Sequence, residues 1–391
     1  MSSSSVDARL DPVAVPEAIA ADFAWSELAA HLTADIDPIA AQLDHDAIAL
    51  AAAFRGLGAR GWLGLRVPKE LGGLGLSDRA YGQVRELLAR HSGALAFLQA
   101  QHQSAAAIVA ASDNTALRDR YLPDLCWGRR SLGISFSHLR RSGEPVLRAE
   151  PTASGDGYHL TGSAPWITGW GCFSESVVAA TLPDGAILLA LIPLDENADR
   201  ATLHFSDPLP LAAMAATQTV SARCDRHFIP RDRCLGARPA DWIRQLDRRN
   251  VMAGAFFALG CAAAALDCLG GTRDRNPWLT THPALGRLTR SLTTCRHNLY
   301  HLPPDAPWEH RLNLRANAIA IAFRATQAAI IAAGGAANGQ HHRAQRLYRE
   351  AVVFAVTGQT PAIAQASLDA IAPDPQQPDH RPDALLSIDG L

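Results

Sequence analysis

The stretch YHLTGSAPWITGWG, residues 158–171, opens with alternating residue types and closes on a glycine-rich turn. Alternation with a period of two predicts a β-strand that has one buried face. A Gly-Asp-Gly turn at 155–157 separates it from a similar segment at 146–150, and the two segments predict a β-hairpin. A second hairpin is predicted around the Pro-Asp-Gly turn at 183–185. Residues 129–237 are therefore expected to form a β-domain.

Helical patterns lie on both sides of this β-domain. Residues 17–128 carry alanine and leucine at helical spacing and predict an N-terminal helical domain. Residues 238–372 return to helices, and two stretches in them, 251–269 and 316–335, are apolar on every face. A helix without a polar face has to be buried on all sides, so these two are expected at the centre of a bundle and are candidates for a subunit interface.

The two ends of the chain differ from the rest. Residues 1–16 are rich in serine and proline and are expected to form a flexible leader, since they lack the basic and apolar regions of a secretory signal. The Pro/Asp-rich residues 373–391 are expected to form a loose tail. The fold class is therefore α+β, with helices before and after a central β-domain.

Composition narrows the range of functions. The 391 residues are 48% hydrophobic and 19% charged, which is enough to build a large core. With 36 basic and 38 acidic side chains the net charge is -2, so neither nucleic acid nor an anionic membrane is an expected partner. Seven cysteines without C-x-x-C spacing predict no disulfide framework and fit a reducing cytoplasm. The apolar helices are mostly alanine, and no membrane span is expected.

Five segments in order resemble the acyl-CoA dehydrogenase family of flavoproteins over nearly the whole chain. They are VPKELGGLGLS at 67–77, YHLTGSAPWITGWG at 158–171, RHFIPRDRCLG at 226–236, ALGCAAAALDCL at 258–269 and GGAANGQHHRAQRLYREA at 334–351. The resemblance implies a helical N-terminal domain, a central β-barrel-like domain and a C-terminal four-helix bundle.

The resemblance also assigns residues to the flavin. Trp166, Ile167 and Thr168 match the strand that lies along the flavin ring in the family, where an aromatic packs on the ring and small donors reach its N5 region. The alternative, that Trp166 is an ordinary core aromatic at a strand end, is less favoured. Ser137 matches a family threonine at the pyrimidine edge, and Thr360 matches another residue of the cofactor site. The implied cofactor is FAD, with FMN as the alternative.

Several positions depart from the family. His138 stands where the family has a carboxylate; a lone histidine on a strand is more often a hydrogen-bonded structural residue than a catalyst. The glycine-serine-aspartate turn that follows in the family is replaced by LRRSGE at 139–144, so contacts to the acyl thioester are in question.

The catalytic base of the family has no counterpart. Dehydrogenation of an acyl thioester needs a carboxylate beside the α-carbon, and the family position falls at Gly358. In some relatives the base lies on the first bundle helix instead, where Asp247 is the nearest acid. A solvated acid at the N-terminus of a helix, where it complements the helix dipole, is the simpler interpretation of Asp247.

The diphosphate end of the cofactor site is also reduced. The family's Arg-x-x-Phe-Gly segment is absent, and only Arg273 and Arg275 remain as candidate phosphate ligands. The glycine-rich segment after the second apolar helix shrinks to Gly334-Gly335, which is also a common way to end a helix. The pair His341-His342 is too closely spaced to bind a metal from one helix face, and no metal is expected.

Three functions follow as hypotheses. The first is a flavin-dependent oxidoreductase acting on the CH-CH group of an acyl thioester, carried on coenzyme A or on a carrier protein. The second is a monooxygenase of the same fold that uses reduced flavin and oxygen and needs no α-proton base. The third is a catalytically silent binding protein. In each case a homodimer or homotetramer is expected, because the two apolar helices bury more surface than one subunit readily covers.

Overall fold

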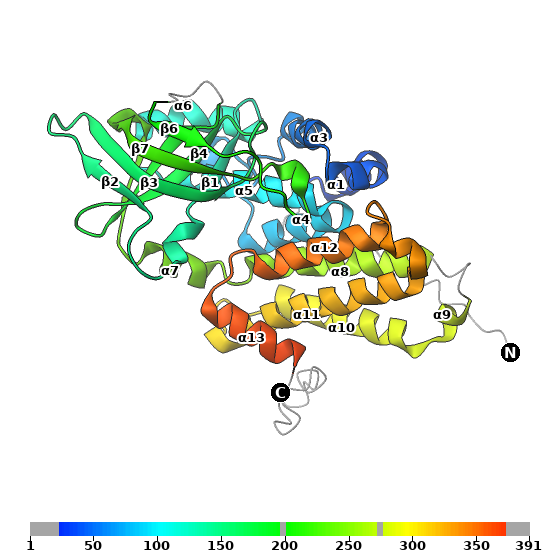
Figure 1. Cartoon of the computed structure of the whole chain (residues 1–391). Coiled ribbons are helices and arrows are strands. Elements are labelled where there is room, and N and C mark those ends of the chain that lie inside the picture. The colour runs from blue at the N-terminus through cyan, green and yellow to red at the C-terminus, as the bar shows by residue number, and fades with distance from the viewer. Residues whose placement is uncertain (1–22, 196–200, 272–276, 373–391) are drawn as a thin grey trace. The chain divides into compact units, whose positions relative to one another are not determined.

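A computed structural model describes residues 23–195, 201–271 and 277–372 (Figure 1). Helices give way to strands at Leu132, and strands give way to helices at Trp242. The first helices are α1 (Trp25–His31), α2 (Ala40–Leu43), α3 (Ala47–Ala59), α4 (Asp78–His91), α5 (Gly93–Ala110) and α6 (Thr115–Cys126). The strands are β1 (Leu132–Ser135), β2 (Leu147–Pro151), β3 (Gly157–Ile167), β4 (Glu175–Thr181), β5 (Ile187–Pro193), β6 (Leu203–Phe205), β7 (Val220–Pro230) and β8 (Cys234–Arg238). The later helices are α7 (Trp242–Arg249), α8 (Ala253–Gly271), α9 (Trp278–Thr281), α10 (Pro283–Tyr300), α11 (Trp308–Ala333), α12 (Arg343–Val356) and α13 (Pro361–Ile371).

Contacts divide the chain into two compact units. The helical unit comprises 1–41, 82–93 and 251–391, and the sheet unit comprises 42–81 and 94–250. The N-terminal helices are therefore shared between the two units, and α4 passes from one to the other at Gly82. The expected N-terminal domain, 17–128, is a continuous helical segment of sequence, but its helices do not cluster together as one body.

The sheet unit is organised around an eight-stranded sheet with the order β6-β7-β3-β2-β4-β5-β8, and β1 pairs with β4 in parallel. Both predicted hairpins are confirmed, because β2 pairs with β3 and β4 pairs with β5 in antiparallel register across the two glycine-containing turns. Strands β5 and β7 also contact each other although they are not neighbours in the strand order. The sheet thus curls toward a barrel-like form, as the family resemblance implies.

The helical unit contains the bundle. Helix α8 contacts α10, α11 and α12, and these helices run side by side in Figure 1. Glycine allows close contact with α4: a Cβ at Gly260 would lie 2.2 Å from the carbonyl oxygen of Glu86. The apolar windows in α8 and in 308–338 are long enough to span a membrane by composition alone, but 78% and 50% of them are buried inside the protein. The expected central place of α8 in a bundle is confirmed.

Buried ion pairs attach α4 to this bundle. Glu86, almost fully buried, accepts hydrogen bonds from Arg296 Nε at 2.7 Å and from the Tyr300 hydroxyl at 2.7 Å, both on α10. Arg90 donates to both carboxylate oxygens of Asp267 on α8 at 2.8 and 3.0 Å. A charge buried in the interior is tolerated when its partners satisfy it, so these pairs determine how the helices align.

His102 connects helix and sheet in the other unit. Its buried ring accepts a hydrogen bond from the Leu132 amide at Nδ1, 3.2 Å away, and donates one from Nε2 to the Leu125 carbonyl, 3.1 Å away. Burial is the main cause that lowers the pKa of His102 from 6.5 to about 4. The ring is therefore neutral, and it joins α5, the end of α6 and the start of β1.

We predict that this histidine makes the protein sensitive to mild acid. Its pKa is about 4 when folded and 6.5 when unfolded, so the unfolded chain binds a proton first as the pH falls. The contribution of His102 to the free energy of unfolding is fully present above pH 6.5 and is lost as the pH falls toward 4. The free energy of unfolding should therefore drop by about 2 kcal/mol between about pH 7 and pH 5. His102→Gln does not titrate, and denaturant unfolding at the two pH values should show a smaller loss for it. An equal loss in both proteins would contradict this role.

Candidate functional site

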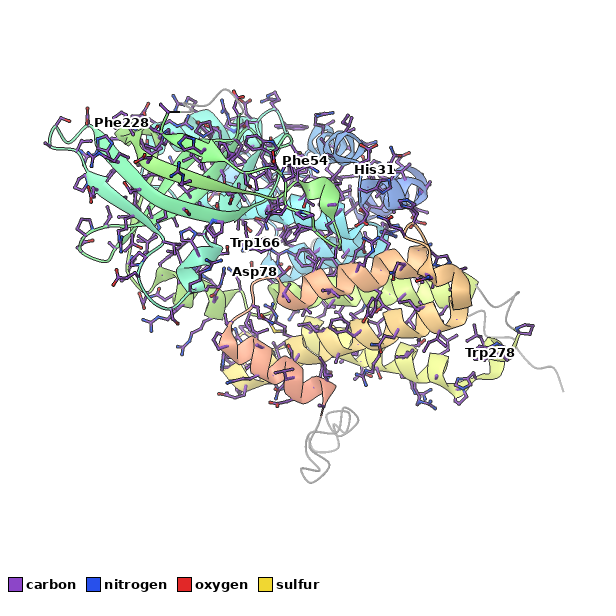
Figure 2. The ribbon with its side chains drawn as sticks, viewed as in Figure 1. His31, Phe54, Asp78, Trp166, Phe228 and Trp278 are labelled. Carbon is purple, nitrogen blue, oxygen red and sulfur yellow. The ribbon has the colours of Figure 1, made fainter. Side chains whose placement is uncertain are left out.

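The end of β3 presents an aromatic side chain in an unusual backbone conformation. Trp166 has a φ of +60° where the pairing of β3 with β7 shifts register between Ala164 and Ile167, and its side chain is 50% exposed (Figure 2). A bulky residue with positive φ is an outlier that costs about 1 to 3 kcal/mol and persists only where the surroundings impose it. The bulge therefore turns the indole outward at a measurable cost. It is not the ordinary core aromatic of the simpler interpretation.

The next two residues of the motif point inward. Ile167 is fully buried, and Thr168 is nearly so, with its hydroxyl 3.3 Å from the hydroxyl of Thr219. Trp166 thus has a flat exposed face beside a rigid, hydrogen-bonded backbone. A planar ring such as a flavin needs a support of this kind.

The structure brings the second predicted cofactor segment to the same place. A Cβ added to Gly133 in β1 would lie 3.1 Å from the carbonyl oxygen of Thr168, so β1 runs directly beside the end of the motif. Ser137, exposed, begins the short 3-10 helix η4 (Ser137–Arg140), which contacts β3. Residues about thirty positions apart in sequence therefore lie together.

His138 is an anchor for η4. Its ring is 4% exposed, and Nε2 donates to the carbonyl of Ala179 on β4 at 2.8 Å. Burial is the main cause that lowers the pKa of His138, so the ring is neutral. A buried ring bonded to the backbone is the structural role that the sequence pattern favoured over catalysis.

Asp247 is held by an arginine. Arg140, at the end of η4, donates from Nε at 2.9 Å and from a terminal nitrogen at 2.6 Å to the two carboxylate oxygens of Asp247 on α7. A bidentate guanidinium pair stabilises the ionised carboxylate and restricts its orientation. Asp247 therefore joins α7 to η4, and this pairing is a poor arrangement for a base that must approach a substrate.

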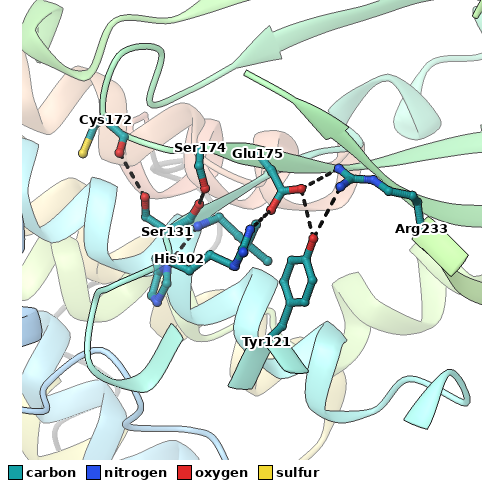
Figure 3. Close-up of polar contacts among 9 residues, drawn as sticks. His102, Tyr121, Ser131, Cys172, Ser174, Glu175 and Arg233 are labelled. Carbon is teal, nitrogen blue, oxygen red and sulfur yellow. Dashed lines mark hydrogen bonds and ion pairs between the residues drawn. The ribbon is translucent and has the colours of Figure 1, made fainter. Parts of the chain in front are cut away.

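A buried carboxylate, that of Glu175, lies at the start of β4, where β4 pairs with the start of β1. Glu175 accepts hydrogen bonds from Tyr121 at 3.1 Å, from Arg130 at 2.8 Å and from Arg233 (Figure 3). Burial, and then the charge of Glu175, raise the pKa of the Tyr121 phenol. These contacts connect α6, β4 and the turn before β8.

Loop contacts continue this network toward β1. The Ser174 hydroxyl donates to the Ser131 carbonyl at 2.9 Å, and the Ser131 hydroxyl donates to the Cys172 carbonyl at 3.0 Å (Figure 3). The residues that precede β1 and β4 are thus tied to each other. These hydrogen bonds fix the position of β1 along β4, and with it the position of Ser137, which follows β1.

The predicted base position lies in the helical unit. Gly358 has a φ of +59° just beyond the end of α12, a conformation that favours glycine, and a Cβ there would meet no atom within 4 Å. Thr360 caps α13: its hydroxyl accepts from the Ile363 amide at 3.3 Å. The Thr360 hydroxyl therefore has a structural role at the start of α13.

Arg315 is a site residue that the sequence analysis missed. It is 3% exposed on α11 and donates to the carbonyl of Val251, just before α8, at 2.9 Å and to the carbonyl of Thr357 at 2.6 Å. It thus joins the turn that contains Gly358 to the start of the first long bundle helix, the two regions where relatives carry a base. Arg315 directly precedes the apolar stretch 316–335, and that position could have indicated a buried cation.

The diphosphate end has little described structure. Arg273 and Arg275 lie outside the described residues. Gly334 ends α11 with a φ of +62°, as a helix-ending glycine does. Within the described ranges, no group of three or more His, Cys, Asp or Glu side chains could hold a metal.

The ring-end residues fit a flavin. The exposed Trp166 offers an aromatic face, the packed Thr168 backbone a rigid strand, and the exposed Ser137 hydroxyl on η4, an element in contact with β3, a pyrimidine-edge donor. Such a surface can hold a planar redox ring and orient it. The described geometry supplies no carboxylate at Gly358 and only an arginine-paired one at Asp247.

Comparisons with known proteins agree with this fold. The family model described as "Acyl-CoA dehydrogenase, N-terminal domain" matches residues 25–129. The very long-chain specific acyl-CoA dehydrogenase of Mus musculus is 32% identical over 139 residues, which cover 33% of this chain and 20% of that enzyme. The 3-(aryl)acrylate reductase of Clostridium sporogenes is 23% identical over 255 residues, 64% of this chain and 65% of that protein. The butyryl-CoA dehydrogenase structure from Megasphaera elsdenii aligns with a TM-score of 0.73 at 17% identity, covering 88% of this chain and 96% of that one. The match to the mouse enzyme spans about a fifth of its length.

We predict that Arg140 and Asp247 act as one structural unit. Arg140→Ala and Asp247→Asn should each lower the stability of the sheet unit by about 1 to 3 kcal/mol, because each leaves a partly buried partner unsatisfied. Thermal unfolding monitors the change. Arg148→Ala, which breaks the exposed pair with Glu144, is the control and should have almost no effect. A loss of turnover in Asp247→Asn at unchanged stability would instead identify Asp247 as a base.

Proposed function

The chain belongs to the acyl-CoA dehydrogenase family of flavin-dependent oxidoreductases, and we propose that it binds FAD and acts on an acyl thioester. The observation that carries the proposal is Trp166, which the β3 bulge turns outward at a φ of +60° beside the end of β1. A core aromatic would need no such bulge. FMN remains the alternative cofactor.

The residues of the sheet unit have separate tasks in this proposal. Trp166 packs on one face of the ring, and the backbone at Ile167 and Thr168 faces its N5 region. The Ser137 hydroxyl donates to the pyrimidine edge. When bound, the flavin accepts or supplies a hydride. His138 and Arg140 touch no reacting atom in this scheme, and they keep η4 and hence Ser137 in position.

Proton removal is the weak step. A carboxylate beside the α-carbon contributes about a hundredfold to ten-thousandfold in rate. Gly358 has no side chain, and Asp247 is engaged by Arg140. This observation favours a second candidate function, a monooxygenase that uses reduced flavin and oxygen on the same fold, because such chemistry needs no α-proton base. A silent binding protein is the third candidate, and absence of flavin would support it.

Assembly and location complete the proposal. We propose a homodimer or homotetramer, since α11, α12 and α13 leave large apolar side chains exposed on the helical unit. We also propose a cytoplasmic location, because all seven cysteines are free thiols. The substrate is a small molecule, with the acyl group carried on coenzyme A or on a carrier protein.

The visible absorption spectrum of the purified protein tests flavin binding. We predict near-stoichiometric flavin, and about tenfold weaker retention or a shifted spectrum in Trp166→Ala, because an aromatic support is lost. Thr168→Ala should have a larger effect than Thr219→Ala, although both remove the same hydrogen bond. No flavin after addition of FAD or FMN would contradict the proposal. Equal flavin content in all variants would show that the end of β3 has only a structural role.

We predict little or no dehydrogenation of butyryl-CoA with an artificial electron acceptor, because the base is missing. Gly358→Glu should raise the rate about tenfold or more. Glutamate there adopts a left-handed backbone at a cost of about 1 to 2 kcal/mol, but its side chain has room. Gly358→Gln has the same strain without the carboxylate and is the control. Rapid wild-type turnover would show that the base lies elsewhere, and Asp247 would be the first residue to mutate.

The oligomeric state is measured by light scattering. We predict a dimer or tetramer mass at micromolar concentration, because the exposed apolar side chains on the helical unit include Ile331, Val352, Val356 and Leu368. A monomer mass would reject the prediction.

A further inference from the structure

The turn η4 and helix α7 concentrate positive charge. Residues 137–141 and 241–250 contain five arginines and two aspartates, a local net charge of +3 in a chain of net charge -2. The two segments are in contact, and the pair Arg140–Asp247 joins them. They therefore form one basic surface of the sheet unit, which we name the η4–α7 surface.

Neither aspartate neutralises the outer arginines. Asp247 is engaged by Arg140 on both carboxylate oxygens, and Asp241 accepts a hydrogen bond from Gln245. The remaining arginines of the surface are exposed, and within the described chain no carboxylate pairs with them. They are Arg141, Arg244, Arg248 and Arg249. Elsewhere in the sheet unit, by contrast, exposed Arg129 pairs with Asp124 and exposed Arg148 pairs with Glu144.

The arrangement on α7 separates these charges from the core. Trp242 and Ile243 face inward, whereas Arg244 and Arg248 are one helical turn apart on the outer face. The helix C-terminus favours cations near Arg248 and Arg249, but that effect does not reach Arg244 or the neighbouring turn. The helix dipole alone therefore does not explain the surface.

The surface adjoins the candidate flavin site. Arg141 follows Ser137 by four residues, a span of at most about 14 Å between Cα atoms. The two anchors of η4, His138 on Ala179 and Arg140 on Asp247, hold both ends of this span. Whatever the arginines bind is held close to the residues that face the cofactor.

We propose that the η4–α7 surface docks an acidic carrier protein that presents the acyl thioester to the flavin. The inference rests on the proposed function, since it names the carrier of the same substrate. Charge complementarity of this kind steers encounter and sets partner choice. The arginines occupy the outer face of a helix and of the turn beside it, whereas small-molecule sites are concave and mostly apolar. That geometry favours a protein surface over a nucleotide as the occupant.

The test is binding of an acidic acyl carrier protein that bears a butyryl-phosphopantetheine arm, followed by fluorescence anisotropy. Wild-type protein should bind it with an affinity that falls as salt is raised. Arg244→Glu/Arg248→Glu should weaken binding at least about tenfold. Arg223→Glu/Arg231→Glu changes the net charge equally on exposed residues of the same unit and is the matched control, expected to bind nearly as wild type.

Three outcomes would overturn the docking proposal. The first is no carrier binding by the wild type at low salt, and the second is an equal loss of carrier affinity in both double variants. The third is a loss of coenzyme A affinity in Arg244→Glu/Arg248→Glu with carrier binding unchanged. The last result would assign the arginines to nucleotide phosphates.

Flavin content tests the proposed function separately. It should be the same in Arg244→Glu/Arg248→Glu and in wild type. Carrier binding in a protein that never retains flavin would reject the oxidoreductase and leave the docking surface standing. Unchanged flavin with no carrier binding would reject the docking surface alone.

Discussion

The buried carboxylate of Glu175 is the interaction on which the sheet unit depends. A charge in that position is costly unless it is matched, and two arginines and a tyrosine match it from separate elements. Because Glu175 begins β4 and β1 pairs with β4, these contacts set the position of β1. The position of β1 in turn decides where Ser137 and η4 lie relative to the end of β3. The Glu175 network therefore lies at the start of β1, next to Gly133, which lies beside Thr168.

The structure also changes the meaning of two candidate catalytic residues. His138 and Asp247 look like possible acids or bases as sequence, since both are ionisable residue types at positions where relatives carry functional groups. In the fold each is bonded to a partner that leaves it little freedom, one to a backbone carbonyl and the other to a guanidinium. Both contacts fix the position of η4, one through β4 and the other through α7. Both side chains therefore support the fold, and neither is free to act as a base.

Much of the fold could be predicted because its signals are local. The glycine-containing turns specify both hairpins, and the composition of 251–269 is enough to place that helix at the centre of a bundle. The motif around Trp166 identified the family, whose fold the solved structures share at 17 to 20% identity. The residue pattern within each segment did not reveal that the N-terminal helices are divided between two units at α4. That division depends on contacts between residues more than a hundred positions apart in the sequence.

The sequence by itself determined the order of helices and strands and the glycine-containing turns. These depend on residue periodicity and on turn chemistry within a few positions. Only the tertiary structure decided that Trp166 is turned outward, that Asp247 is paired with Arg140 and that Arg315 joins Val251 to Thr357. Each of these depends on a partner 42 to 107 residues away or on the register of a neighbouring strand. Hydrogen bonds and ion pairs act over a few ångströms in space, and a sequence contains no direct record of which distant residues folding will bring within that range.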